Sequence, residues 1–136
     1  MEFLGNANKD ITTDPRHIRV NYKGVFIGRG TIQSLGIAEG DYIEFVKDRH
    51  GYLWLRKSNA NYGYRLKKVN QHLYVNNVSL ARNIAKVAYG SYQKEFEPFV
   101  LLTTDLSTDT DGNKCVEVFT SRIFRTRMYY DKKEKI

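Results

Sequence analysis

The stretch Lys23–Phe45 constrains the fold of this chain more than any other part of its sequence. It reads KGVFIGRGTIQSLGIAEGDYIEF, which is an alternating apolar strand, a short helix-like piece and a Gly-Asp turn into a second strand. Such a unit offers one apolar sheet face and one short helix, and it cannot close a hydrophobic core alone. We therefore expect the chain to pair this unit with a second unit of similar shape.

The residues on either side of this stretch complete the first unit. Alternating apolar residues predict two strands within residues 16–28, with Gly24 as a bend between them. A short helix follows, for which Thr31 is the expected N-cap and Gly36 the expected C-terminal stop. The segments DYIEFVKD and YLWLRK then predict a hairpin whose turn is RHG. The predicted order is strand, strand, short helix and hairpin.

After a small polar linker at 58–63, the same order of elements recurs. YRLKKVNQHLYV predicts two strands, NNVSLARNIAKVAYG a helix capped by Asn77 or Ser79, and EPFVLLTTD and KCVEVFTS a strand and its returning partner. Val25–Leu35 aligns with Leu73–Asn83, apolar residues on apolar residues. YIEF then matches FVLL, and YLWLR matches CVEVF. We expect an internal repeat, although this order of elements also recurs by chance in small proteins.

The first unit resembles the AbrB/MazE/SpoVT family of swapped-hairpin barrels over residues 17–57, less than a third of the chain. The matching segments are RVNYKGVFIG, LGIAEGD and YIEFV with GYLWLRK, and the corresponding positions are Val25, Ile27, Leu35, Gly36, Ile37, Gly40 and Asp41. The resemblance implies a barrel of two interlocked units, which the family usually builds as a homodimer. A chain with two units would build it alone, as a monomeric pseudo-dimer, or would associate further as a homodimer.

The expected fold class is mainly β, that is β-rich α+β, and the resemblance implies a swapped-hairpin-type barrel built from two tandem strand-strand-helix-hairpin units. A chain of 136 residues with 41% hydrophobic residues has enough apolar side chains for one such core. The expected segments are a polar N-terminal lead-in at 1–14, a first unit at 15–57, the linker at 58–63, a diverged second unit at 64–122 and a basic C-terminal tail at 123–136.

The first unit departs from the family at positions that matter for binding. The proline that follows the apolar strand in the family is Gly28 here, and the paired helix arginines that contact DNA fall at Ile32 and Gln33. Of the family's basic positions that face DNA, only Arg19 is matched well. We therefore expect weak sequence specificity, or specificity through the shape of the DNA.

The charge of the chain is unevenly distributed and indicates a polyanionic partner. The formal net charge is +7, and the segment from Arg49 to Lys94 holds many Lys, Arg and Tyr residues and Trp54 but no Asp or Glu. Cations without nearby carboxylates neutralise phosphates best, although basic residues also serve simply as solvated surface. We predict a DNA-binding protein with a role in transcription regulation, which contacts double-stranded DNA through Arg19, Lys23, Arg29, Arg65, Lys67, Lys68 and Arg82.

Two other partners are compatible with the same sequence. RNA is one, because aromatic side chains stack on unpaired bases, although strand residues such as Trp54 and Tyr74 more often pack in the sheet. An acidic protein is the other. The chain would then be an antitoxin-like module, or a phage or mobile-element protein, that binds through its basic surface or through the tail Ser121–Ile136. In that tail Ile123, Phe124, Met128 and Tyr129 are candidate anchors, unless Ile123–Met128 completes a final strand.

Catalytic and metal sites are not expected. The glycines near Arg29 lack the Lys-Ser/Thr of a P-loop, and no Ser-His-Asp or Cys-His arrangement is indicated. One cysteine and three scattered histidines allow no zinc-ligand spacing. The segment Asp105–Asp111 superficially resembles a calcium loop, but it lacks the closing bidentate Glu. We therefore expect no enzyme activity, no cofactor and no metal.

The location of the protein is also predicted from absences in the sequence. Apolar runs are too short to span a membrane, and the N-terminal residues do not have the pattern of a signal peptide. The single Cys115 rules out an internal disulfide and fits a reducing compartment. We therefore expect a cytoplasmic protein that does not bind membranes.

Overall fold

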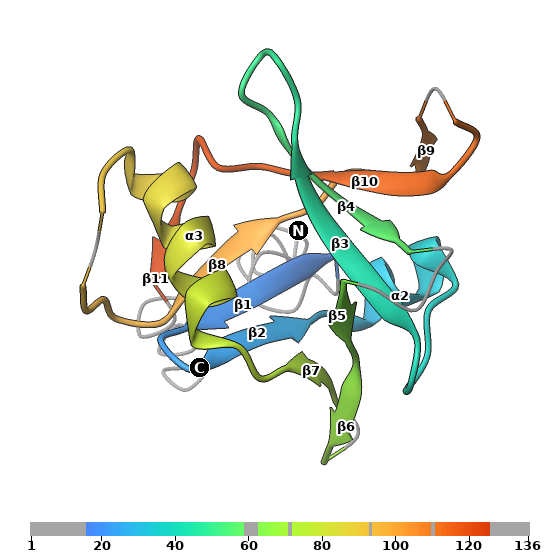
Figure 1. Cartoon of the computed structure of the whole chain (residues 1–136), viewed down its shortest axis with the longest axis horizontal. Helices are drawn as coiled ribbons and strands as arrows, with labels where there is room; N and C mark the ends of the chain where they lie inside the picture. Colours follow the sequence, from blue (N-terminus) through green and yellow to red (C-terminus); the bar gives the residue numbers. More distant parts are fainter. Residues whose placement is uncertain (1–15, 59–62, 71, 93, 110, 126–136) are drawn as a thin grey trace, which may run out of the picture.

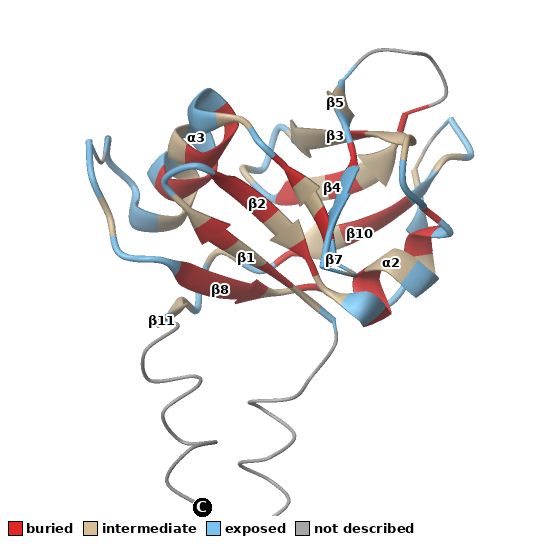
Figure 2. Cartoon of the chain, turned by 90° about the horizontal axis from the view of Figure 1, so that it is seen from below, coloured by how far each residue is buried: buried red, intermediate tan, exposed pale blue. Residues whose placement is uncertain are grey.

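The fold is described from a computed structural model, which places residues 16–58, 63–70, 72–92, 94–109 and 111–125. Within these residues the chain forms two antiparallel β-sheets and two α-helices, α2 (Arg29–Leu35) and α3 (Val78–Tyr89). The two helices lie at opposite ends of the molecule (Figures 1 and 2). The predicted β-rich fold class is confirmed. No helix of the described residues has both the length and the apolar character needed to cross a membrane.

The larger sheet has six strands in the order β11-β8-β1-β2-β7-β6. Its strands are β1 (His17–Asn21), β2 (Gly24–Ile27), β6 (Lys67–Val69), β7 (His72–Val75), β8 (Phe99–Leu102) and β11 (Phe124–Arg125). The smaller sheet has five strands in the order β5-β3-β4-β10-β9. Its strands are β3 (Tyr42–Lys47), β4 (Leu53–Lys57), β5 (Tyr64–Arg65), β9 (Ser107–Thr108) and β10 (Lys114–Val118). In the part of the chain described, both sheets are open and neither closes into a barrel.

In each sheet, one junction between the two halves of the chain pairs two strands that align with each other in the sequence. In the six-stranded sheet β2 pairs with β7, and Phe26 lies opposite Tyr74 at the centre of the register. In the five-stranded sheet β4 pairs with β10, and Trp54 lies opposite Glu117. In the sequence alignment of the two halves, Phe26 aligns with Tyr74 and Trp54 aligns with Glu117. At each of these two junctions, a strand of the first half therefore pairs with the strand that aligns with it in the second half. The aligned residues lie opposite each other.

The halves also exchange strands. Strand β8 of the second half pairs with β1 of the first half, and β3 of the first half pairs with β5 of the second. This differs from the expectation that β8 and β10 form a hairpin, because they lie in different sheets, and an isolated bridge joins Thr103, just after β8, to Val118 of β10. The burial of β8 explains the difference. Phe99, Val100 and Leu101 are all fully buried, and β8 lies inside the six-stranded sheet between β11 and β1.

A single hydrophobic core lies between the inner faces of the two sheets and beneath the helices. Along β1 the buried residues Ile18 and Val20 alternate with half-buried ones, and this alternation is visible in Figure 2. Leu55 on β4 and Val116 on β10 add fully buried side chains from the facing sheet. Helix α3 contributes the stripe Leu80, Ala81, Ile84 and Ala85.

The helix ends agree with the sequence except at the start of α2. Gly36 ends α2 in the left-handed conformation, with φ at 64°. Asn77 caps α3 by accepting a hydrogen bond of 2.8 Å from the Leu80 N–H. The prediction that Thr31 is the N-cap of α2 is wrong, because the helix begins after Gly28 and has no side-chain cap. Thr31 is instead buried, with its hydroxyl 2.8 Å from the hydroxyl of Thr103.

Candidate nucleic-acid interface

One row of side chains crosses the outer face of the six-stranded sheet. The strand registers place Arg19, Phe26, Tyr74 and Lys67 opposite one another on four neighbouring strands, β1, β2, β7 and β6. Val100 of β8 continues this register beyond Arg19 but is fully buried. Residues directly opposite in antiparallel strands share a face of the sheet. Because the neighbours of these residues on β1, β2 and β7 point into the core, the row points away from it. We call it the Arg19–Lys67 row.

Aromatic contacts hold the centre of this row together. The guanidinium carbon of Arg19 lies 4.2 Å from the ring centroid of Phe26, and the Phe26 and Tyr74 centroids are 4.3 Å apart. The ring of His72 approaches Phe26 edge-on, at 6.3 Å. Partial burial raises the pKa of the Tyr74 phenol, and the nearby charge of Arg19 acts in the opposite direction. The phenol is therefore neutral near pH 7, and Arg19 is fixed by stacking rather than by a carboxylate.

Gly24 makes this stack possible. A Cβ atom at Gly24 would lie 2.0 Å from the carbonyl oxygen of Val75 and 2.8 Å from the hydroxyl oxygen of Tyr74. Only glycine allows β2 to approach β7 this closely with the Tyr74 ring folded over it. The turn before Gly24 is closed by Asn21, whose side-chain oxygen accepts hydrogen bonds from the N–H groups of Lys23 and Gly24. The predicted bend at Gly24 is therefore the start of a closely paired strand.

Apart from Arg125, the Lys and Arg residues on the strands of this sheet form no ion pair among the described residues. The strands of the six-stranded sheet, as far as they are described, contain no Asp or Glu. Among the described residues, no carboxylate forms an ion pair with any of the seven predicted DNA-contacting cations. Other basic residues are paired: Arg16 with Asp105, Arg56 with Glu44 and Asp109, Lys57 with Asp41, and Arg125 with Glu97. The predicted set is thus available to an external anion.

The structure separates some predicted residues that the sequence placed together. Lys67 lies opposite Tyr74, on the outer face, whereas Lys68 lies opposite the buried Leu73 and points to the other side of β6. Both are exposed, because β6 is the edge of the sheet. Arg19 and Lys67 are therefore the two predicted cations that share the row.

The remaining predicted cations lie around the sheet rather than on the row. Lys23 sits in the turn between β1 and β2, with its ammonium 5.7 Å from the Tyr22 ring centroid. Arg29 is the first residue of α2, beyond the other end of β2. Arg65 belongs to β5 of the five-stranded sheet. Arg82 lies on α3, where its Nε is buried without a hydrogen-bond partner among the described residues.

Phe26 belongs to the row and His72 contacts it from β7, but the charge pattern of the sequence does not single out either residue. A signal for Phe26 is nevertheless present, because it lies between two apolar residues of an alternating strand, Val25 and Ile27, that face the core. Trp54 and Tyr74, expected to pack in the sheet, are half-buried on the outer faces of the two sheets. The tail begins as β11, where Phe124 pairs with Val100; residues 126–136 lie outside the described residues.

Comparisons with protein-family models, curated proteins and solved structures gave no match to this chain. Within the described residues, no group of three His, Cys, Asp or Glu side chains is arranged to hold a metal ion. The interface is therefore interpreted from its own geometry and charge.

Proposed function

We propose that this chain is a non-enzymatic, double-stranded DNA-binding protein of the AbrB-like transcription-regulator type. The observation that carries the proposal is the Arg19–Lys67 row, in which cations without carboxylate partners lie on a sheet whose described strands have no acidic residue. Phosphate oxygens are the anions that such a surface attracts most strongly, because DNA carries them in dense arrays. The row would face the duplex, and the surrounding cations Lys23 and Arg29 would extend the contact along the backbone.

We also propose that the chain is a tandem pair of swapped-hairpin units that acts as a monomeric pseudo-dimer. The two junctions support this, because strands related by a two-fold axis pair about one shared position, as β2 with β7 and β4 with β10 do. The exchange of β8 onto β1 and of β3 onto β5 supports it further, because each half then completes the sheet of the other.

The dimensions of the row suit a groove of B-DNA. Arg19 and Lys67 are separated by three strand spacings, which is about 14 Å at about 4.8 Å per spacing. The major groove is about 12 Å wide. Two long basic side chains at this separation can reach phosphates on opposite sides of such a groove, while Phe26 and Tyr74 lie between them.

The row also limits how much sequence information the protein can read. Arg19 is stacked on Phe26, and Lys67 is a flexible point charge, so neither is fixed in the bidentate geometry that recognises guanine. Phosphate contacts position a protein on DNA but carry no base information. We therefore propose that affinity comes mainly from the backbone and that preference among sequences follows DNA shape.

The first test is a fluorescence-anisotropy titration of the full chain with a labelled duplex, its single strand and a matched RNA, each at two salt concentrations. We expect the duplex to bind most tightly and its affinity to fall steeply with salt. Absence of binding to all three nucleic acids at low salt would overturn the proposal. The acidic-protein alternative would then be tested with a pull-down in which residues 126–136 are deleted.

A matched pair of double variants tests the location of the interface. Arg19→Ala with Lys67→Ala removes both cations of the row. Lys47→Ala with Lys114→Ala removes two exposed cations of the five-stranded sheet and changes the net charge equally. We expect the first variant to bind duplex about tenfold more weakly, with a salt slope smaller by about 2, and the second to change little. Equal losses in the two variants would show that the row is not the interface.

A further inference from the structure

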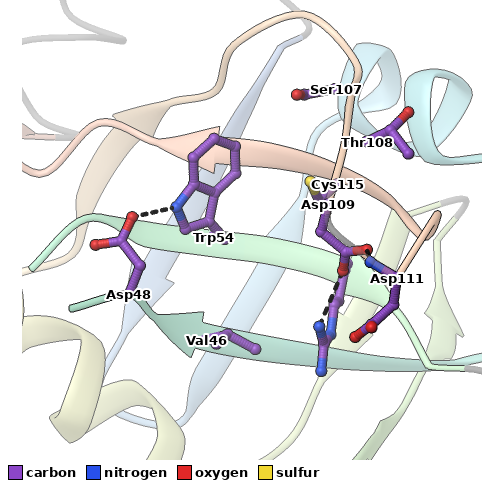
Figure 3. A pocket seen from close by; sticks show the side chains of 9 residues that line it. Val46, Asp48, Trp54, Ser107, Thr108, Asp109, Asp111 and Cys115 are labelled. Atoms are coloured by element: carbon purple, nitrogen blue, oxygen red, sulfur yellow. Dashed lines mark hydrogen bonds and ion pairs between the residues drawn. The ribbon is translucent and has the colours of Figure 1, made fainter. Parts of the chain in front are cut away.

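A pocket of about 400 Å³ lies on the outer face of the five-stranded sheet, which does not carry the Arg19–Lys67 row. Figure 3 shows the indole of Trp54 on one side of this pocket and Asp109 and Asp111 on the other. Val46 on β3 and Cys115 on β10 contribute apolar surface. A volume of this size accommodates a small organic molecule. We refer to it as the Trp54 pocket.

The indole of Trp54 is held in place at its edge by a hydrogen bond. Its Nε1–H donates a hydrogen bond of 2.9 Å to Asp48. The other oxygen of Asp48 accepts hydrogen bonds from the N–H groups of His50 and Tyr52, so the carboxylate is fixed by the turn between β3 and β4. Among the described residues, no aromatic ring or cation stacks on the indole. The ring is thus held in one orientation where it lines the pocket.

The opposite side of the pocket is equally fixed. One oxygen of Asp109 accepts hydrogen bonds of 2.9 Å from the N–H groups of Asp111 and Asn113, which closes the turn between β9 and β10. The other oxygen accepts a hydrogen bond of 3.0 Å from Arg56, whose second nitrogen lies 3.3 Å from Glu44. The pocket therefore lies between two turns that are each held by hydrogen bonds to an aspartate side chain.

The charges that line this pocket favour a cation. Arg56 is the only cation among the described residues that line it, and it is already bonded to two carboxylates. The hydrogen bond from Trp54 lowers the pKa of Asp48, and the backbone N–H of Asn113 lowers the pKa of Asp109, so both carboxyls are ionised at neutral pH. Asp111 adds a carboxylate with no side-chain hydrogen bond among the described residues. The resulting negative charge disfavours phosphates and carboxylic acids.

The apolar lining of the pocket favours a methylated cation over a primary ammonium. Burial raises the pKa of the Cys115 thiol, which therefore stays protonated and presents apolar surface next to Val46. A primary ammonium would lose strongly held water against such surface, whereas methyl groups on nitrogen would gain contact with it. The face of tryptophan is also the best aromatic partner for a cation. We propose that the Trp54 pocket binds a small organic cation of the quaternary-ammonium class.

Trp54 supplies the assay, because it is the only tryptophan in the chain. Its fluorescence is followed while the full chain is titrated with choline or with dimethylbutanol, the uncharged isostere in which carbon replaces the quaternary nitrogen. Sodium chloride keeps the ionic strength of the two series equal. We expect a saturable change with choline and at least about tenfold weaker binding of the isostere. Equal responses to the two compounds, or no response to choline, would overturn the proposal.

Two carboxylate variants separate a local site from a general charge effect. Asp111→Asn removes the pocket carboxylate that supports no fold contact among the described residues, and we expect it to weaken choline binding about threefold. Glu39→Gln removes an exposed carboxylate that does not line the pocket, and we expect no change. If both variants weakened binding equally, the Trp54 pocket would not be the site. Because duplex affinity is measured separately, failure here leaves the DNA-binding proposal standing.

Discussion

The outer faces of the two sheets use arginine in opposite ways. On the six-stranded sheet Arg19 rests on the ring of Phe26 and has no carboxylate partner among the described residues. On the five-stranded sheet Arg56 lies between Glu44 and Asp109, and all three side chains are at most 26% exposed. An arginine bound by two carboxylates braces the fold, and an external phosphate would have to displace them. An arginine held by an aromatic ring keeps its hydrogen-bond donors available.

The first prediction concerns the glycine beneath the aromatic stack. Gly24→Ala places a Cβ against the Val75 carbonyl oxygen, which belongs to the backbone and cannot move aside easily. We expect a loss of about 3 kcal/mol in the free energy of unfolding. Urea denaturation followed by circular dichroism measures this loss.

A glycine of the other sheet provides the control. Gly112, in the turn between β9 and β10, has φ at 82°, but a Cβ added there would meet no atom within 4 Å. Gly112→Ala therefore suffers only left-handed backbone strain, and we expect a loss of about 1 kcal/mol. Equal losses in the two variants would mean that the close approach of β2 to β7 does not limit the fold.

The second prediction concerns the braced arginine. Arg56→Ala leaves Glu44 and Asp109 partly buried without their cation, and we expect the free energy of unfolding to fall by about 2 kcal/mol. Arg125→Ala removes an ion pair to Glu97 in which both side chains are 62% exposed, and we expect less than about 0.5 kcal/mol. The urea midpoints of the two variants, measured at equal salt concentration, test whether Arg56→Ala loses more stability than Arg125→Ala. A larger loss for Arg125→Ala would contradict the contrast between the faces.

The third prediction separates two neighbouring lysines. Lys67 points to the outer face of the sheet and Lys68 to the other side of β6. If the outer face meets the duplex, Lys67→Ala should weaken duplex binding about fivefold and Lys68→Ala about twofold or less. Both variants remove the same charge, so anisotropy titrations at one salt concentration compare them directly. The reverse order would place the DNA on the opposite side of β6.

The fourth and smallest expected effect is a dependence of stability on pH that arises from a carboxyl group beside the five-stranded sheet. Backbone hydrogen bonds, from Asn113 first, hold the pKa of Asp109 below its ordinary value of 3.8. A carboxyl with a lowered folded pKa contributes stability above its ordinary pKa, and that contribution is lost as the pH falls through the folded value. We expect the urea concentration at the unfolding midpoint to decrease as the pH is lowered below about 4. In Asp109→Asn this decrease should be smaller. An unchanged pH profile in the variant would contradict the assignment.

The elements that follow from local signals could be predicted from the sequence. The strands around Gly24, the hairpin that ends at Lys57 and the helix capped by Asn77 follow from alternation, turn residues and capping, which depend on neighbouring residues only. The partner of β8 could not be predicted, because its residues are apolar on both faces and are compatible with any two neighbours. The role of Thr31 could not be predicted either, because its hydroxyl partner, Thr103, is distant in the sequence.

The candidate interface was predictable in its chemistry but not in its arrangement. Charge distribution alone identifies cations without carboxylates nearby in the sequence, such as Lys67 and Lys68. Their opposite directions, and the stacking of Arg19 on Phe26, depend on strand registers that join distant segments. Composition therefore indicates the class of partner, whereas only pairing between the two halves shows which face would meet it.

The exchange of strands between the halves has a consequence for biosynthesis. His17 pairs with Leu102, so β1 has no neighbour on that side until a ribosome has made most of the chain. Pairings this distant along the chain form slowly, because a large loop must close before any contact is gained. In that interval the exposed edge of β1 is open to the β8 strand of another nascent molecule. Crowded or slow synthesis should therefore favour entangled dimers, and dilute synthesis should favour the monomer.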